Sequence, residues 1–183
     1  MGARHLLIYG PPAAGKLTVA RAIAARWDVR VLDNHVAVDA ALRLFAFGEP
    51  GFFDLVDSIR VTMLRAAAAA GRDVVSTFVY GHPTDQEALE RLLAPSREHG
   101  ADVLVAQLLP SADETRRRVT AESRRTTNKL SDLATYDSVA ARHDLRTPYP
   151  GTDLTIDNTH LPATDVAEQL AARVGFRARV DAP

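Results

Sequence analysis

The sequence predicts a three-layer α/β domain, with a five-stranded parallel sheet between two layers of helices. Short apolar runs alternate along the chain with longer segments of helical composition. Strands that are separated by helices in this way pair in parallel, with helices on both faces of the sheet. The chain has 183 residues, of which 46% are hydrophobic and 25% charged, and this is enough for one sizeable core. We therefore expect residues 1–183 to form a single domain.

Five apolar runs have the length and composition of buried strands: residues 5–9, 29–32, 73–80, 103–109 and 154–157. The predicted helices are residues 15–27, 36–47, 52–70, 84–99, a segment that begins after Ser111, 131–145 and 162–174. Ser111 and Glu114 have the spacing of a capping box, and Ser131 is a candidate N-cap. We expect the tail, residues 175–183, either to add an edge strand or to fray.

The segment GPPAAGKLT, residues 10–18, lies between the first predicted strand and the first predicted helix. Its glycines and lysine have the GxxxxGK spacing of a phosphate-binding loop. Gly10 and Gly15 permit backbone conformations that bring several N–H groups into one concavity, and the positive end of the next helix adds to it. Lys16 is expected to reach the β- and γ-phosphates of a nucleotide. The predicted nucleotide-binding residues here are Gly10, Pro11, Pro12, Ala13, Ala14, Gly15, Lys16, Leu17 and Thr18. A tight turn without a ligand is the alternative, but it would not need the lysine.

Two features depart from the usual magnesium site of such loops. The residue after the lysine is Leu17, where Ser or Thr would supply a hydroxyl ligand, and Thr18 stands one position late. In addition, the third predicted strand, residues 73–80, does not end in an acidic residue. We still expect Mg²⁺ and ATP as cofactors. The predicted metal ligands are Thr18 and Asp33, together with water and the phosphates.

Polar residues follow the second predicted strand, at the edge where open α/β sheets bind ligands. The predicted acceptor-binding residues are Asp33, His35, Arg60 and His82, and Tyr80 lies in the same region. Arg60 on a helix is alternatively a surface salt-bridge residue, and His82 a loop residue. Four aromatic residues either wall an apolar pocket or, as their helical spacing favours, belong to the core: Phe45, Phe47, Phe52 and Phe53.

Four features together resemble the small P-loop kinases. They are GPPAAGK, an Asp-x-His after the second strand, an arginine-rich segment after the fourth strand, and the closing IDNTHLPATDVAEQL. Shikimate and gluconate kinases have this fold, as do chloramphenicol and tunicamycin resistance proteins. The resemblance implies the strand order 2-3-1-4-5, a mobile arginine-bearing lid that closes over ATP, and a loop after the fifth strand that touches adenine.

Carried over to this chain, the resemblance places the lid at about residues 118–130. Arg118 and either Arg124 or Arg125 would contact phosphates, because positive charge that arrives on closure stabilises the transferring phosphoryl group. A solvated basic helix face is the alternative for any single arginine. The adenine loop would contain Asn158 and Thr159.

The base that accepts the proton of the acceptor hydroxyl is expected at Asp33. Shikimate kinases carry Asp-x-Asp where this chain has Asp33-Asn34-His35. Residues two apart in an extended segment point the same way, so both side chains would reach the γ-phosphate. Asp33 could also hold a magnesium-bound water, which leaves His35 to position the acceptor. Two alternatives stay open: His35 is the base, or Asp33 caps the following helix. The predicted catalytic residues are Lys16, Asp33, His35, Arg118 and Arg124.

These patterns favour a phosphotransferase that moves the γ-phosphate of ATP to a hydroxyl of a small metabolite or antibiotic. A nucleotide-binding resistance or switch protein that does not transfer phosphate is the alternative that Leu17 favours. A nucleic-acid end kinase is a third possibility, and the net charge of −1 counts against it.

Composition also bears on location and partners. The chain has no cysteine, which excludes disulfides and thiolate metal sites. Its apolar stretches are interrupted by charge before they could span a bilayer, and its N-terminus lacks a signal-peptide pattern. We expect a cytoplasmic protein with no membrane partner and little affinity for nucleic acid, present as a monomer or homodimer, with a small-molecule hydroxyl acceptor as its substrate.

Overall fold

A computed structural model describes residues 2–121 and 132–179 of the chain. Its centre is a five-stranded parallel sheet in the order β2-β3-β1-β4-β5. The strands are β1 (Arg4–Tyr9), β2 (Arg30–Leu32), β3 (Val74–Phe78), β4 (Asp102–Leu108) and β5 (Leu154–Ile156). The predicted three-layer architecture and the strand order 2-3-1-4-5 are confirmed.

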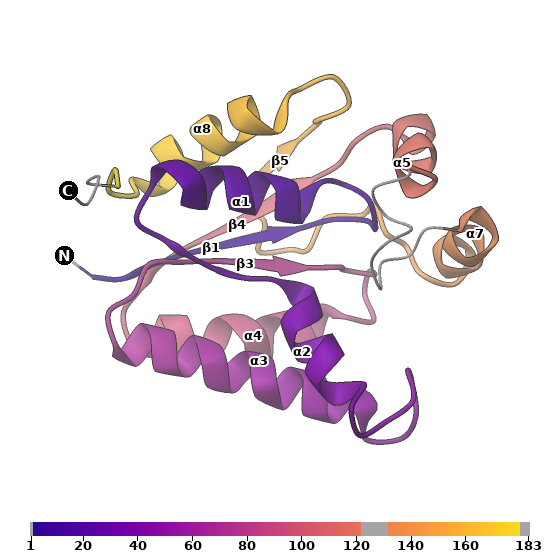
Figure 1. The fold of residues 1–183 in the computed structure, drawn as a ribbon, viewed down its shortest axis with the longest axis horizontal. Coiled ribbons are helices and arrows are strands. Elements are labelled where there is room, and N and C mark those ends of the chain that lie inside the picture. The colour runs from indigo at the N-terminus through magenta and orange to yellow at the C-terminus, as the bar shows by residue number, and fades with distance from the viewer. Residues whose placement is uncertain (1, 122–131, 180–183) are drawn as a thin grey trace.

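Helices cover both faces of the sheet (Figure 1). One layer contains α1 (Lys16–Arg26) and α8 (Ala163–Val174), and the other contains α3 (Phe52–Ala69) and α4 (Gln86–Glu98). The short helix α2 (Asn34–Ala41) packs against α3. Two further helices, α5 (Ala112–Val119) and α7 (Leu133–Arg142), lie beyond the carboxyl ends of the strands. None of the described helices is both long and apolar enough to cross a membrane.

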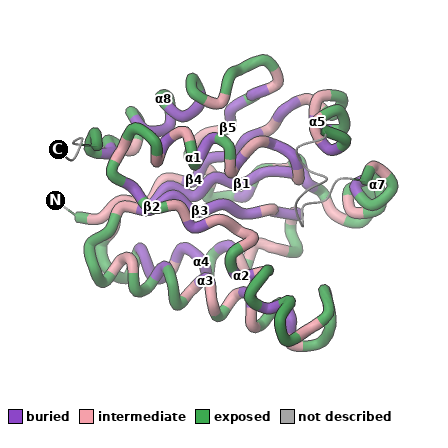
Figure 2. Tube along the Cα trace, viewed as in Figure 1, coloured by how far each residue is buried: buried purple, intermediate pink, exposed green. Residues whose placement is uncertain are grey.

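Strand β1 supplies both halves of the core because it lies in the middle of the sheet. Leu6 and Ile8 pack into the cluster beneath α1 and α8, whereas Leu7 and Tyr9 pack into the cluster above α3 and α4. All four are completely buried. In Figure 2 the central strands are accordingly purple and the outer faces of the helices green. Burial on both faces explains why these strands are continuous apolar runs.

The ends of several elements differ from the predicted ones. Helix α2 begins at Asn34, two residues earlier than expected, because Asp33 caps it, and it ends at Ala41 rather than at residue 47. Helix α7 is capped by Asp132, whose carboxylate accepts from the N–H groups of Ala134 and Thr135. The predicted cap Ser131 lies outside the described residues.

Two other expectations concern the start of α5 and the tail. Ser111 is the N-cap of α5 and accepts from the N–H of Glu114, as predicted. The described part of the tail, residues 175–179, forms one antiparallel bridge, between Trp27 and Ala178. This contact holds the tail beside the end of α1, although it is too short to count as an edge strand.

Candidate active site

The loop after β1 has the backbone conformation that its glycines predict. Gly10, Ala13 and Gly15 all have positive φ, at 147°, 65° and 91°. At Gly10 a side chain is also excluded by space, because a Cβ would lie 2.2 Å from the carbonyl oxygen of Leu108 in β4. Ala13 adopts the left-handed region without being glycine, a type of strain that is concentrated at functional sites. The loop is therefore a built concavity at the start of α1 and not a simple connection.

Lys16 lies inside this loop. Its Nζ donates hydrogen bonds to the carbonyl oxygens of Gly10 and Pro11, at 2.9 and 2.7 Å, and the residue is only 9% exposed. The ammonium group is thus held within the concavity, at the positive end of α1. A cation and a helix N-terminus in one place make this the strongest candidate phosphate site in the described part of the chain.

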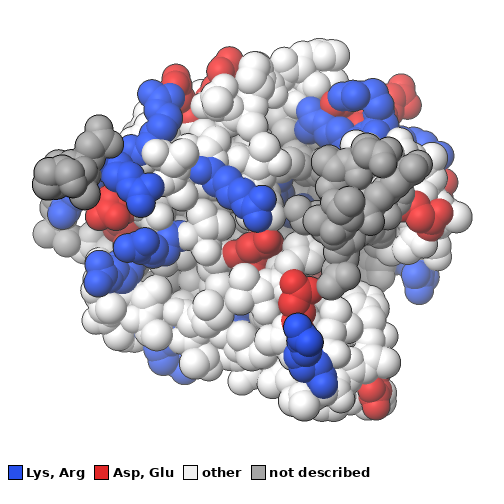
Figure 3. Space-filling view, in the orientation of Figure 1, with Lys and Arg blue, Asp and Glu red and all other residues white. Residues whose placement is uncertain are grey.

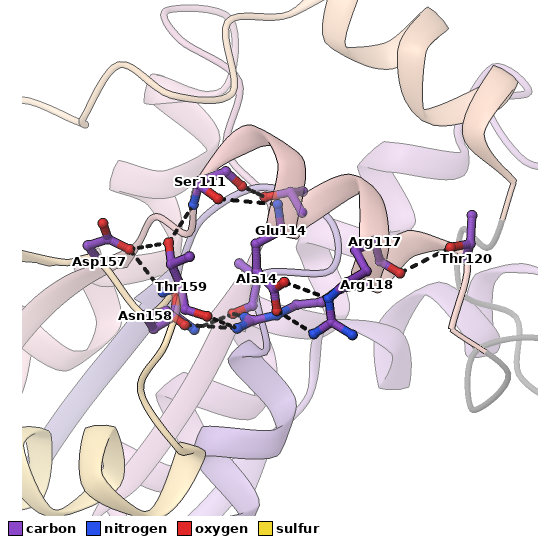
Figure 4. A network of polar contacts seen from close by, with 10 residues as sticks. Ala14, Ser111, Glu114, Arg117, Arg118, Thr120, Asp157, Asn158 and Thr159 are labelled. Atoms are coloured by element: carbon purple, nitrogen blue, oxygen red, sulfur yellow. Dashed lines mark hydrogen bonds and ion pairs between the residues drawn. The ribbon is translucent and has the colours of Figure 1, made fainter.

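Arg118 connects the loop to the segment after β5 (Figure 4). Its guanidinium donates to the carbonyl oxygens of Ala14 at 3.4 Å, Asn158 at 2.8 Å and Thr159 at 3.3 Å. The amide Nδ2 of Asn158 donates to the same Ala14 carbonyl at 2.8 Å. Arg118 is therefore not part of a solvated basic helix face. The structure brings it together with Asn158 and Thr159, whereas Arg124 and Arg125 lie outside the described residues.

Helix α5 holds the Arg118 side chain in this position. The carboxylate of Glu114 accepts from Nε of Arg118 at 2.6 Å and also binds Arg117. These two arginines hold the pKa of Glu114 at about 2. The hydroxyl of Thr159 accepts from the N–H of Ser111 at 2.8 Å, which ties the start of α5 to the same segment. An open hollow of about 430 Å³ lies between the start of α5 and the segment after β5. It is lined by Ser111, Asp113, Glu114, Arg117, Asp157, Thr159 and His160.

Asp33 follows β2 and has the capping role that was one of the alternatives. Its Oδ1 accepts from the backbone N–H of His35 at 3.1 Å. The helix begins at Asn34, so Asp33 and His35 do not share an extended segment. The prediction that their side chains point the same way assumed an extended backbone, and that premise does not hold. Capping engages one carboxylate oxygen, and the described residues give the other oxygen no hydrogen bond. The cap is therefore compatible with a second role.

Arg60 is neither a surface salt-bridge residue nor an unengaged anion clamp. It is 9% exposed, and its guanidinium donates to Asp57 at 3.0 Å and to Oδ1 of Asn34 at 2.5 Å. Burial lowers the pKa of Arg60, and Asp57 opposes that shift. The group also lies over the ring of Phe78, 5.4 Å from its centroid. Arg60 thus supports the turn that carries Asp33.

Strand β3 does not end in the acidic residue that commonly binds magnesium beside such loops, in agreement with the sequence. His82 is engaged on both sides: its N–H donates to the Asp144 carbonyl at 2.7 Å, and its Nδ1 pairs with the hydroxyl of Tyr80 at 3.0 Å. The nearby carboxylate of Asp85 accepts from the N–H of Gly81 at 2.8 Å, and burial raises the pKa of Asp85. Sequence reasoning missed Asp85, because it lies in no motif and follows the strand by several residues.

The predicted burial of the four aromatic residues is only partly right. Phe52 is completely buried between α2 and α3, but Phe47 and Phe53 are 70% and 54% exposed. The prediction assumed that one helix continues to residue 47, whereas α2 ends at Ala41 and the chain then turns away. Phe53 follows Phe52 by one helical position, so its side chain points about 100° away from that of Phe52 around the helix axis.

The described residues contain no group of three or more His, Asp or Glu side chains placed to hold a metal ion. Thr18 is exposed on α1. Mg²⁺ in nucleotide enzymes is commonly held by one or two carboxylates together with phosphate oxygens and water. A single carboxylate at Asp33 fits that pattern, although it does not make a metal site by itself.

Searches against protein-family models and against curated proteins found no match to this sequence. Solved structures do match. The tunicamycin resistance protein of Deinococcus radiodurans is 19% identical, with a TM-score of 0.65, and the match covers 97% of this chain and 99% of that one. The APS kinase of Mycobacterium tuberculosis, solved with AMPPNP and APS, is 13% identical with a TM-score of 0.61, over 93% and 96% of the two chains. Shikimate kinase of Acinetobacter baumannii is 20% identical with a TM-score of 0.56, over 94% of each.

These likenesses extend over nearly the whole chain, and the matched proteins have different names and bound ligands. At such low identity they establish the architecture alone. The chain has the fold of the small-molecule P-loop kinases.

Proposed function

We propose that this chain is an ATP-dependent phosphotransferase that moves the γ-phosphate to a hydroxyl group of a small molecule. The observation that carries the proposal is the convergence of two distant segments on a loop that holds a buried lysine. Lys16 lies inside the loop, and Arg118 and Asn158 both bind its Ala14 carbonyl from outside. A concavity with a buried cation, braced by an arginine, suits a polyphosphate and not an uncharged ligand.

The acceptor side of the site is the end of β2. In the proposed step the acceptor oxygen forms a bond to the γ-phosphorus, and the bond from that phosphorus to the β,γ-bridging oxygen breaks. ADP leaves with the electron pair, and the hydroxyl proton passes to the Asp33 carboxylate. Such a transfer has a loose transition state, so it needs accurate positioning more than a strong base.

The remaining side chains have supporting parts in this mechanism. Lys16 and the N-terminus of α1 stabilise charge on the β- and γ-phosphates. Arg60 holds Asn34, and thereby the turn that carries Asp33. When Mg²⁺ is bound it neutralises phosphate charge, and Asp33 is the residue that would hold it, with Thr18 a weaker candidate because it is exposed.

A nucleotide-binding protein without transfer is the second candidate, and one observation favours it. Leu17 occupies the position of the usual hydroxyl ligand, and no acid ends β3. A nucleic-acid end kinase has less support. On the face drawn in Figure 3 the basic side chains are interspersed with acidic ones, and the net charge is −1.

The test is an acceptor screen with the full chain and Mg-ATP, in which ADP formation and phosphorylated product are both measured. Product that appears only with a hydroxyl compound supports the phosphotransferase. Tight ATP binding with no product from any acceptor supports the second candidate instead. Lys16→Ala should abolish binding or turnover. The matched control is Arg21→Ala, which removes an exposed cation from the same helix and should leave both unchanged.

A further inference from the structure

Three exposed apolar side chains lie close together in the sequence, and we call them the aromatic corner: Leu44, Phe47 and Phe53. They are 76%, 70% and 54% exposed. The ring centroid of Phe47 lies 5.7 Å from that of Phe53, and both rings pack against the buried Phe52 at 5.1 Å. The corner lies where the chain passes from α2 into α3, at the end of α3 towards which the strands point (Figure 1).

This exposure is concentrated in one region. Six of the seven exposed large hydrophobic residues in the described chain fall between residues 36 and 63: Val36, Leu42, Leu44, Phe47, Phe53 and Met63. Single exposed apolar residues are normal on protein surfaces, whereas contiguous ones mark binding sites. The packing of α2 on α3 does not require these side chains, because Ala37, Ala41, Phe52 and Val56 already fill that interface.

One residue of the aromatic corner, Phe53, shares a helix face with a residue that supports the proposed acceptor site. Phe53, Asp57 and Arg60 are spaced by four and three residues, so they share one face of α3. Arg60 on that face binds Asp57 and Asn34, and Asn34 is the neighbour of Asp33. Phe53 therefore lies about 10 Å along the same helix face from the residue that supports the proposed base, at a rise of 1.5 Å per residue.

We propose that the aromatic corner binds an apolar part of the acceptor, so that the substrate is an amphiphilic alcohol. Its hydroxyl lies at Asp33 and its hydrocarbon or aromatic body lies over Phe47 and Phe53. This inference rests on the proposed phosphotransferase function. A stable protein partner would need roughly 20–30 residues on each side. Three side chains next to a small-molecule site are the size of one ligand's apolar portion.

The test compares primary alcohols of increasing chain length, from butanol to octanol, with the polyols glycerol and erythritol. It uses the full chain with Mg-ATP and measures kcat/KM from ADP formation. Full burial of one methylene group gives up to about a fourfold gain, and burial of one side of it about twofold. We expect kcat/KM of the wild type to rise about twofold to fourfold for each methylene group added to the alcohol. The slope should be flat in Phe47→Ser and Phe53→Ser.

Met63→Ser is the matched control. It removes another exposed apolar side chain from α3, about 15 Å further along the helix from Phe53, and should keep the slope. Turnover of polyols with no dependence on chain length would overturn the amphiphilic acceptor and leave the phosphotransferase standing. If no alcohol raises ADP formation above its rate in water alone, the amphiphilic acceptor is overturned, and the acceptor screen described above decides the phosphotransferase separately. A dimer that Phe47→Ser converts to a monomer, seen by analytical ultracentrifugation, would reassign the corner to a second copy of the chain.

Discussion

The buried histidine of β1 leads to a quantitative prediction about stability. His5 is 2% exposed, and its ring nitrogens pair with the hydroxyls of Ser96 and Ser76 at 2.8 and 2.7 Å. Burial lowers the pKa of His5 from 6.5 to about 4, and Arg97 adds to the shift. The folded state therefore holds this imidazole neutral over a pH range in which the unfolded chain protonates it.

The sign and size of the effect follow from linkage. Above the unfolded pKa of about 6.5 both states are neutral, and His5 adds no pH dependence. Below about pH 6.5 His5 is protonated in the unfolded chain but stays neutral in the folded chain. The free energy of unfolding therefore falls with pH until the pKa of the folded state is reached. Between about pH 7.5 and pH 4.5 the loss is about 2.5 kcal/mol, at about 1.4 kcal/mol per pKa unit.

The perturbation is His5→Gln, which keeps a side chain that can hydrogen-bond the two serines but cannot titrate. Urea unfolding at a series of pH values gives the free energy of unfolding of both proteins. We expect the variant to be less stable at neutral pH and to lose about 2.5 kcal/mol less than the wild type on acidification to about pH 4.5. Carboxylates with lowered pKa, such as Asp144 at about 2, act at lower pH and are common to both proteins. Parallel pH profiles for the two proteins would refute the reasoning.

Five substitutions test the site itself. Lys16→Ala should weaken ATP binding at least tenfold in titration calorimetry while the chain stays folded, and unchanged affinity would sink the phosphate-site assignment. Asp33→Asn should keep the helix cap, because Asn caps about as well as Asp, yet lower the transfer rate by tenfold or more. Normal turnover there together with an inactive His35→Ala would make the histidine the base, with an acidic limb in the rate profile. Arg118→Lys should raise the KM for ATP, because a lysine cannot donate to the carbonyls of the loop and of the segment after β5 at once. An unaltered KM would contradict a supporting role of Arg118 at the loop. Gly10→Ala should prevent folding or cost several kcal/mol in urea unfolding, because no space exists for its Cβ.

The fold could be predicted because its strongest signals are local. A strand buried on both faces must be apolar throughout, so Leu6 to Tyr9 appear in the sequence as an uninterrupted run. The phosphate-binding loop is marked in the sequence by Gly10 and Gly15. Both have positive φ angles, which other residues adopt only with strain. Helix ends are less well determined by local sequence. One capping carboxylate at Asp33 was enough to move the start of α2 by two residues.

The candidate site was predictable only in part, because its contacts join residues far apart in the chain. Spacing alone identified Lys16, but nothing local indicates that Arg60 is buried against Asp57 and Asn34 rather than exposed on a helix. Likewise, helical spacing cannot distinguish Phe52 from Phe53, one of which is buried and the other exposed. Which side of a helix is covered depends on the neighbouring elements, and the sequence does not state where those lie.

Contacts to the Ala14 carbonyl explain how the loop keeps its shape. Two side chains, Arg118 and Asn158, converge on the carbonyl of Ala14, between the strained Ala13 and the left-handed Gly15. They come from segments 104 and 144 residues away in sequence. The loop's conformation is therefore supported by tertiary contacts and not only by its glycines. Because Arg118 binds the loop and the segment after β5 at once, a movement of α5 that withdraws Arg118 would loosen both, which couples the position of α5 to the phosphate site.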